Sequence, residues 1–134
     1  MNDGGEVPIE TEVDIVVARR AVRDAATRAR FSITDVTRIV TAASELARNT
    51  FQYAGKGTMH WRLIENDGRQ GLELRFVDEG PGIADVEQAL QQGYSSGEGL
   101  GMGLPGAKRL MDEMEIQSHP GKGTTITVKK WRKT

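Results

Sequence analysis

The order of helix-like and strand-like patterns limits the fold of this chain more than any other feature. Strand-like runs are expected at 7–13, 59–65, 72–77, 115–118 and 124–131, and helix-like runs at 15–30, 36–53, 85–92 and 105–114. The later strands come in adjacent pairs and do not alternate one by one with helices. This order favours hairpins over a doubly wound parallel fold. We therefore predict an α+β two-layer sandwich, with helices covering one face of a mixed β-sheet.

Local signals mark the ends of these elements. Asp14 is a plausible N-cap for the first helix, and Ser32 or Thr34 can cap the second. Gly55 follows the second helix at a position suited to a left-handed turn. Asp67-Gly68 lies between two strand-like runs, which is a hairpin signal. The chain has no internal repeat or linker-like segment, so residues 1–134 are expected to form a single domain.

The overall composition excludes several classes of protein. Lys and Arg total 18 against 19 Asp and Glu, a net charge of −1, which argues against broad binding to nucleic acid or an anionic membrane. No apolar run approaches the roughly 20 residues of a membrane span. Zero cysteines exclude disulfides and thiolate chemistry. We expect a cytoplasmic protein with no nucleic-acid or membrane partner.

Glycine is concentrated in one part of the chain. Eight of the 16 glycines lie between Gly80 and Gly106, and 94–103 is predicted to be a mobile loop leading into a helix. Such a backbone presents free N–H groups to an anion such as a phosphate, although a plain flexible linker remains an alternative. Residues 101–106 match G-x-G-x-x-G, but no strand precedes them, so a Rossmann site is rejected. The chain has no P-loop motif.

Two further groups of residues have chemistry that a ligand could use. Glu45 and Asn49 are four apart, and hence neighbours on one helix face, where their oxygens suit a hard cation. Asp78 and Gly80 begin a turn directly after a predicted strand. Each group has a plain alternative: a solvated pair near a helix end, and an ordinary β-turn. Neither His60 nor His119 has a metal-like partner spacing, so no catalytic role is expected for them.

The order of these groups resembles one known superfamily. Glu45 and Asn49 on a helix are followed by Asp78-x-Gly80-x-Gly82, by Gly99-x-Gly101-x-Gly103 at a helix start, and by Gly123-Thr124 before the last strand. This arrangement is similar to the Bergerat-type ATP-binding fold of the GHKL superfamily, which includes DNA gyrase, histidine kinases and MutL. Residues 44–49, 53–57 and 99–113 resemble the RsbT-type switch serine kinases of the stressosome, relatives of the anti-sigma factor kinases RsbW and SpoIIAB.

The resemblance implies roles for individual residues. Asn49 would coordinate the Mg²⁺ that bridges the ATP phosphates, and Glu45 would be the general base. Asp78 would accept the adenine amino hydrogen, with Thr124 supporting the same pocket. The whole ATP-binding set implied by the resemblance is Asn49, Asp78, Gly80, Gly82, Ile83, Gly99, Leu100, Gly101, Met102, Gly103, Leu104 and Thr124.

Two departures from the family pattern affect the expected site. Only 16 residues separate Gly82 from Gly99, which is short beside most histidine kinases. Gln52 stands where many histidine kinases carry a Lys, so phosphate contact at that position is in doubt. Lys56 or Lys122 could substitute, and the sequence does not choose between them.

The resemblance also implies a function. No phospho-acceptor His segment precedes the domain, so we expect a lone nucleotide module that acts on a separate protein. The leading hypothesis is a protein-serine/threonine kinase that phosphorylates a STAS-domain antagonist with Mg-ATP and then binds and activates a PP2C-type phosphatase. The alternatives are an RsbW-type anti-sigma factor and a detached histidine-kinase ATP domain. The acceptor residue, the downstream target, the oligomeric state and the ATP affinity stay open.

Overall fold

A single antiparallel sheet forms the base of the structure. The computed structural model describes residues 3–80 and 104–133. Within them the strands are β1 (Gly4–Ile9), β2 (Gly57–Asn66), β3 (Arg69–Asp78), β4 (Glu113–His119) and β5 (Gly123–Trp131). Their order is β1-β2-β3-β5-β4, and every neighbouring pair is antiparallel. The expected helix at 85–92 and the expected loop at 94–103 lie outside the described residues.

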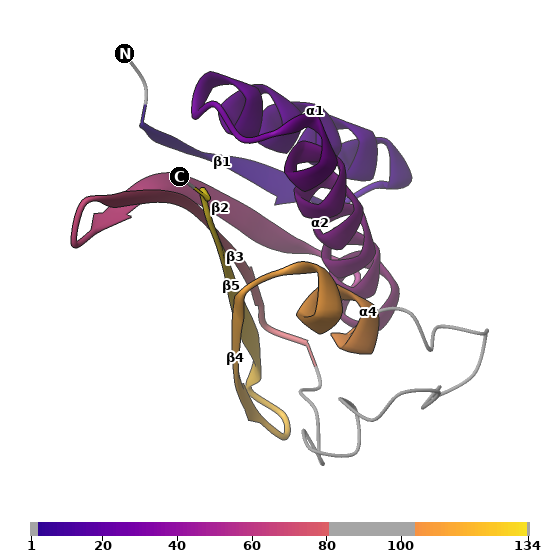
Figure 1. The fold of residues 1–134 in the computed structure, drawn as a ribbon. Helices are drawn as coiled ribbons and strands as arrows, with labels where there is room; N and C mark the ends of the chain where they lie inside the picture. The colour runs from indigo at the N-terminus through magenta and orange to yellow at the C-terminus, as the bar shows by residue number, and fades with distance from the viewer. Residues whose placement is uncertain (1–2, 81–103, 134) are drawn as a thin grey trace.

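The helices cover one face of this sheet. They are α1 (Glu12–Arg28), α2 (Ile33–Ala54) and α4 (Leu104–Leu110), and all lie on the same side (Figure 1). The α+β two-layer prediction is therefore confirmed. The prediction of a mixed sheet is wrong, because α1 and α2 together carry the chain back and forth between β1 and β2. A crossover through two antiparallel helices returns an antiparallel strand, whereas one helix would give a parallel one.

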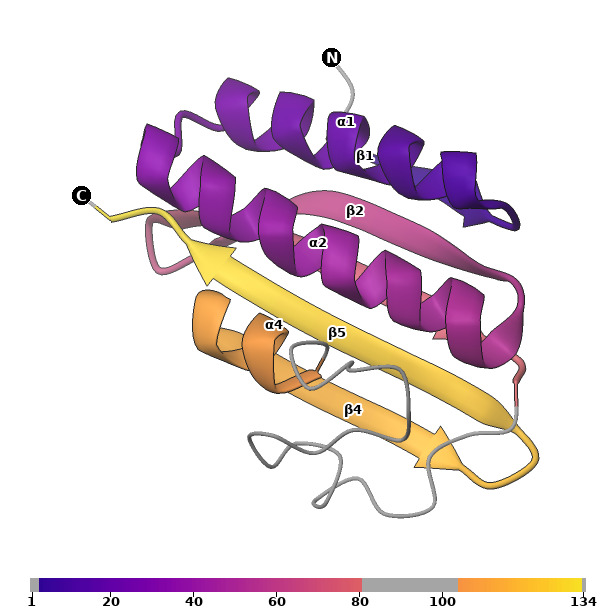
Figure 2. The ribbon, with the colours of Figure 1, turned by 90° about the vertical axis from the view of Figure 1, so that its right-hand side faces the viewer.

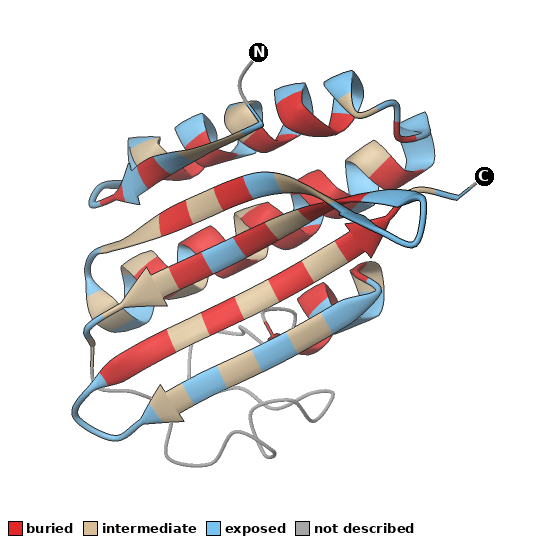
Figure 3. Ribbon diagram, turned by 90° about the vertical axis from the view of Figure 1, so that its left-hand side faces the viewer, coloured by how far each residue is buried: buried red, intermediate tan, exposed pale blue. Residues whose placement is uncertain are grey.

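Alternating burial along the strands places the core between sheet and helices. Leu72, Leu74 and Phe76 of β3 are almost fully buried and belong to one core with residues of α1 and α2, and exposed or half-buried residues lie between them in the sequence. Figure 3 shows this alternation of burial along the strands. Val22 of α1 and Leu46 of α2 complete the same core with no exposed surface. The described helices include none with the length and apolar character that a membrane crossing requires.

Most of the predicted element ends are confirmed. The Ser32 hydroxyl accepts a hydrogen bond from the backbone N–H of Asp35 at 3.1 Å and caps α2. Gly55 ends the same helix with a φ of 81°. Asp67 and Gly68 have φ values of 53° and 81° and join β2 to β3, as expected of a tight hairpin.

The start of α1 differs from the prediction. Thr11 is the N-cap, and Asp14 lies three residues inside the helix. One oxygen of Asp14 accepts the backbone N–H groups of Glu10 at 2.8 Å and Thr11 at 3.0 Å. These hydrogen bonds lower the pKa of the Asp14 carboxyl below its usual 3.8, and the one from Glu10 has the largest effect.

Two other boundaries are also corrected. The first strand begins and ends earlier than 7–13, at Gly4–Ile9. Helix α4 ends at Leu110 and does not continue to Met114, which lies in β4. The reason is Asp112, whose carboxylate accepts the backbone N–H of Trp131 at 2.8 Å and whose own N–H donates to the carbonyl of Lys129. These bonds draw the chain into the sheet immediately after the helix.

Candidate nucleotide site

The C-terminal half of α2 lies directly against the ends of two strands. A Cβ added to Gly57, at the start of β2, would lie 2.5 Å from the Thr50 methyl group. One added to Gly80, just after β3, would lie 2.6 Å from Cβ of Ala54. Only glycine allows such close approach. These two contacts bring the last turns of α2 over the strand end that carries Asp78.

Asp78 is held by two backbone groups. Its Oδ1 accepts the N–H of Gly80 at 3.0 Å and the N–H of Thr124 at 3.2 Å. Thr124 is also its register partner on β5. Across the described ranges, 3–80 and 104–133, no hydrogen bond to Oδ2 is found. Within these residues, one oxygen of the carboxylate is fixed by the protein and the other makes no hydrogen bond, which is the arrangement needed to accept an adenine amino hydrogen.

Thr124 is buried beside Asp78, on the helix-covered face of the sheet. Its hydroxyl lies 2.8 Å from the Ser118 hydroxyl, which in turn lies 3.3 Å from the carbonyl of Gly123. The structure thus brings together Asp78 and Thr124, which sequence analysis predicted as parts of one pocket. Sequence analysis missed Ser118, although its position opposite Thr124 follows once β4 and β5 are paired in this register.

Gly123 makes the contact between β5 and the Asp78 turn possible. Its φ is +96°, and a Cβ there would lie 2.1 Å from the carbonyl oxygen of Asp78. A side chain would therefore push β5 away from the residue whose carboxylate binds Thr124. Sequence analysis placed Gly123 next to Thr124 in the motif but did not identify this reason for it.

Glu45 and Asn49 lie one turn apart on α2 and are both half-buried. The neighbouring Thr50 is buried, and its hydroxyl donates to the carbonyl of Leu46 at 3.1 Å. In the described part of the chain, the side chains of Glu45 and Asn49 make no hydrogen bond. Their carboxylate and amide oxygens are of the ligand type that Mg²⁺ prefers. This ion commonly binds only one or two protein ligands and takes the others from substrate phosphates and water.

The described residues contain no preformed metal site. No group of three or more His, Asp or Glu side chains with metal-binding geometry occurs in residues 3–80 and 104–133. This suits an ion that arrives with ATP, since phosphate oxygens then supply the remaining ligands.

The structure describes only some of the other residues that were predicted to bind ATP. Leu104 is the first residue of α4 and is buried, and α4 packs against α2. Gly80 lies against α2 as described above. The remaining predicted residues, Gly82, Ile83, Gly99, Leu100, Gly101, Met102 and Gly103, lie outside the described residues.

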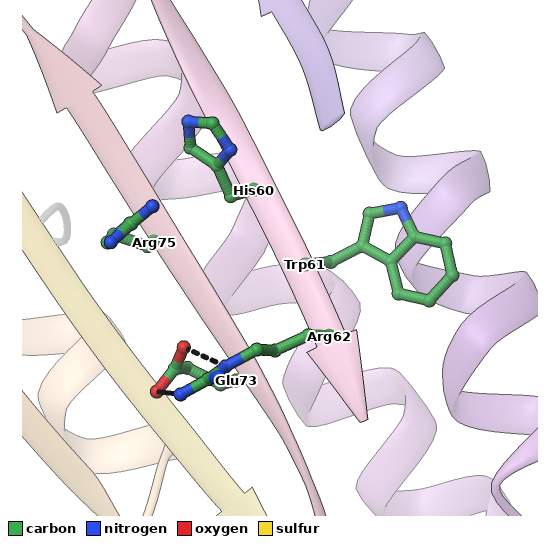
Figure 4. A pocket seen from close by; sticks show the side chains of 5 residues that line it. All are labelled: His60, Trp61, Arg62, Glu73 and Arg75. Carbon is green, nitrogen blue, oxygen red and sulfur yellow. Dashed lines mark hydrogen bonds and ion pairs between the residues drawn. The ribbon is translucent and has the colours of Figure 1, made fainter. Parts of the chain in front are cut away.

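A hollow on the opposite, uncovered face of the sheet is a separate feature. It is lined by His60, Trp61, Arg62, Glu73 and Arg75, none of which belongs to the predicted site (Figure 4). The Arg62 guanidinium donates to both Glu73 oxygens at 2.8 and 3.3 Å, and this contact raises the pKa of Arg62 above its usual value. Because none of the predicted site residues lines this hollow, we keep the candidate nucleotide site at the strand end that carries Asp78.

Comparisons with known proteins agree with this geometry. Residues 8–130 match the family described as histidine kinase-like ATPase domain. The chain is 47% identical over 131 residues to the serine/threonine-protein kinase RsbT of Bacillus subtilis, covering 98% of both chains. It is 34% identical over 122 residues to an anti-sigma F factor of Caldanaerobacter subterraneus, covering 85% of this chain and 82% of that protein.

A solved structure has a similar fold. The RsbU and RsbW domains of a Mycobacterium tuberculosis protein match with a TM-score of 0.65 and 20% identity, covering 97% of this chain and 34% of the longer one. At that identity the likeness concerns the fold alone. The family match and the near full-length identity to RsbT go further. The chain belongs to the histidine kinase-like ATPase family, within the group of partner-switching kinases that includes the serine/threonine-protein kinase RsbT.

Proposed function

We propose that this protein transfers the γ-phosphoryl group of Mg-ATP to a Ser or Thr of a STAS-domain antagonist. The observation that carries the proposal is Asp78, with Oδ1 fixed by Gly80 and Thr124 and Oδ2 left for a base. Support comes from the 47% identity to a named serine/threonine-protein kinase over almost the whole chain. On this proposal residues 1–134 act as one nucleotide-binding domain.

In the proposed complex, adenine lies against Asp78, with Thr124 beside it, and the phosphates extend toward α2. Mg²⁺, when bound through Asn49, would offset negative charge on the phosphates. Gly80 would let the backbone pass close to the nucleotide. The proposal also assigns ATP binding to Gly82, Ile83, residues 99–103 and Leu104, on the resemblance of their motifs to the family.

Glu45 acts as the general base in this proposal. Its carboxylate accepts the proton of the acceptor hydroxyl as that oxygen bonds to the γ-phosphorus. The bond from the γ-phosphorus to the bridging oxygen breaks at the same time, and ADP leaves with the electron pair. Its half-buried position one turn from Asn49 supports this role, because it is close to the proposed metal-binding amide without being used in the core.

The proposed partners are those that the resemblance to the stressosome kinases implies. A STAS-domain antagonist of the stressosome would be the acceptor, and a PP2C-type phosphatase would be the output regulator that the kinase binds and activates after release. We place this switch in the cytoplasm, where ATP is available. Nucleic acid and membrane are not part of the proposal, since the net charge is −1.

Phosphotransfer to a STAS-domain protein tests the proposal directly. The purified chain is mixed with that protein, Mg²⁺ and γ-labelled ATP, and acid-stable label on the acceptor is measured. We expect transfer by wild type, a loss of at least about 100-fold in Glu45→Ala, and little change in Glu65→Ala, an exposed control. No transfer by wild type, or undiminished transfer by Glu45→Ala, would contradict the kinase mechanism. Acid-labile label would indicate a histidine acceptor.

An anti-sigma factor is the second candidate, favoured by the 34% identity to an anti-sigma F factor. In that case the ATP site would regulate binding, and a sigma factor would be the main partner. A pull-down from cells distinguishes the two. Recovery of a sigma factor, without a STAS-domain protein or a phosphatase, would favour the second candidate.

A further inference from the structure

A buried lysine joins three elements near the opposite end of β5 from Thr124, the register partner of Asp78. Lys130 lies near the end of β5, and its side chain is only 6% exposed. Its ammonium donates to the carbonyl of Leu110, the last residue of α4, at 3.0 Å. It also lies 3.4 Å from a carboxylate oxygen of Asp112 and 4.0 Å from one of Asp35, near the start of α2. In the view of Figure 2, β5 lies between α2 and α4. The contacts of Lys130 with Asp35 and Leu110 connect it to both helices.

The partners of Lys130 are themselves held in place. The Asp35 side chain is 7% exposed and pairs with Arg38 at 3.1 Å. Asp112 accepts the backbone N–H of Trp131 at 2.8 Å. Removing the lysine charge would therefore leave each carboxylate with one partner. It would remove the contact from β5 to the last carbonyl of α4 and loosen the connection between α2 and α4.

Burying the Lys130 ammonium group costs desolvation free energy. Burying an ion pair is often no more stabilising than apolar residues of the same volume would be. What a charged donor with two hydrogen-bond acceptors and a third carboxylate at 4.0 Å adds is direction, because each hydrogen bond fixes where its acceptor lies. Helix α4 has only seven residues, so its first residue, Leu104, is about 9 Å along the axis from the carbonyl that Lys130 holds.

We propose that Lys130 is a positioning residue for the phosphates of ATP, a role that rests on the function proposed above. It fixes α4 relative to α2, and therefore fixes the start of α4, where the glycine-rich segment ends, relative to Asn49 and Glu45. Lys130 is six residues from Thr124 along β5, about 20 Å, so it does not touch the nucleotide. The backbone groups that hold Asp78 belong to Gly80 and Thr124, and none of the contacts of Lys130 described above involves either residue, so we expect the adenine contact to change less than the phosphate contacts when Lys130 is replaced.

Comparing ATP with adenosine tests the role, because adenosine uses the Asp78 contact without the phosphates. Binding of each is titrated to wild type, Lys130→Met and Lys129→Met, following the Thr124 amide resonance. Lys129 is adjacent on the same strand but on the uncovered face, where it lies 4.0 Å from Glu73. We expect Lys130→Met to weaken Mg-ATP binding at least fivefold and to change adenosine binding less than twofold. Lys129→Met should change neither more than twofold.

The possible outcomes separate this role from a structural one. Equal losses for ATP and adenosine in Lys130→Met would mean general destabilisation, and an unchanged ATP affinity would mean no role at all; either overturns the inference. Failure of wild type to bind ATP would instead refute the proposed function, and the inference with it. If Lys130→Met does not fold, Asp35→Asn replaces it, and a selective loss of ATP affinity is again required.

Discussion

Asp78 and Thr124 face each other across β3 and β5, and Oδ1 of Asp78 accepts the backbone N–H of Thr124 at 3.2 Å. The N–H of Gly80 donates to the same oxygen at 3.0 Å. Because both bonds use one oxygen, the carboxylate plane is oriented by the protein before any ligand binds. In the proposed function, the other oxygen, Oδ2, would accept the hydrogen bond from the adenine amino group.

The first prediction concerns Asp78→Asn. The amide oxygen can replace Oδ1 and keep both backbone bonds, so the fold should survive. The amide nitrogen then takes the place of Oδ2 and presents a donor where the adenine amino group requires an acceptor. A polar contact of this kind is worth about 1–3 kcal/mol, so calorimetry should show ATP binding weakened by roughly tenfold or more.

The control for this prediction is Glu79→Gln. Glu79 is the next residue, is exposed, and loses the same charge when substituted. Its effect on ATP binding should therefore be small. An ATP affinity of Asp78→Asn equal to that of wild type would mean that Asp78 does not read the base.

The second prediction compares two glycines in the β4–β5 turn. Gly121 has a φ of +79° and open space around it, whereas a Cβ on Gly123 would clash with the Asp78 carbonyl. Alanine at Gly121 should cost about 1–2 kcal/mol of unfolding free energy, from backbone strain alone. Alanine at Gly123 adds overpacking and should cost about 2–5 kcal/mol in all.

Urea unfolding of the two variants measures this difference. Gly123→Ala should also bind ATP more weakly than Gly121→Ala, because displacement of β5 separates Thr124 from Asp78. Equal unfolding free energies in the two variants would show that β5 can move away from the Asp78 turn without cost.

Much of the fold could be predicted because it depends on local signals. The hairpin at Asp67 and Gly68 and the end of α2 at Gly55 each require a positive φ that these residue types adopt readily. The cap at Ser32 is likewise a contact within three residues. Asp78 and Thr124, although 46 residues apart, were predicted together only through the resemblance to a known superfamily.

The failures come from contacts that a local pattern does not contain. The end of α4 is set by Asp112 reaching Trp131 on β5, and the apolar spacing through Met114 gives no sign of it. Strand direction depends on how many helices cross between strands, and the sequence pattern around β1 does not state which strand pairs with it. The close approaches at Gly57 and Gly123 are also tertiary, so even the motif that contains Gly123 did not reveal the contact that requires a glycine there.

The third prediction is a pH effect on α1. Hydrogen bonds from Glu10 and Thr11 lower the pKa of Asp14 below 3.8, so its carboxylate stabilises the folded state above that pH. The stabilisation is lost as pH falls below 3.8 and through the lower, folded-state pKa. Asp14→Ala should therefore lower Tm at pH 7 and differ less from wild type near pH 3.

Thermal unfolding at several pH values tests this effect, with Glu10→Ala as the control. Glu10 is exposed, and it takes part in the cap only through its backbone N–H. Its variant should follow the wild-type pH dependence. A Tm difference between Asp14→Ala and wild type that does not shrink at low pH would mean that the Asp14 charge is not what stabilises this helix end.

The last prediction separates metal binding from base recognition. Asn49 has no hydrogen-bonded role in the described core, so Asn49→Ala should leave Tm nearly unchanged while removing the amide oxygen proposed for Mg²⁺. ATP affinity is measured with Mg²⁺ and again with EDTA. We expect a loss of roughly tenfold with Mg²⁺ and little loss in EDTA, because a metal ligand matters only when the metal is present. Asp78→Asn should weaken ATP binding under both conditions, since adenine recognition needs no metal. An Asn49→Ala loss of the same size with and without Mg²⁺ would assign Asn49 to direct nucleotide contact and leave the metal ligand to be sought elsewhere.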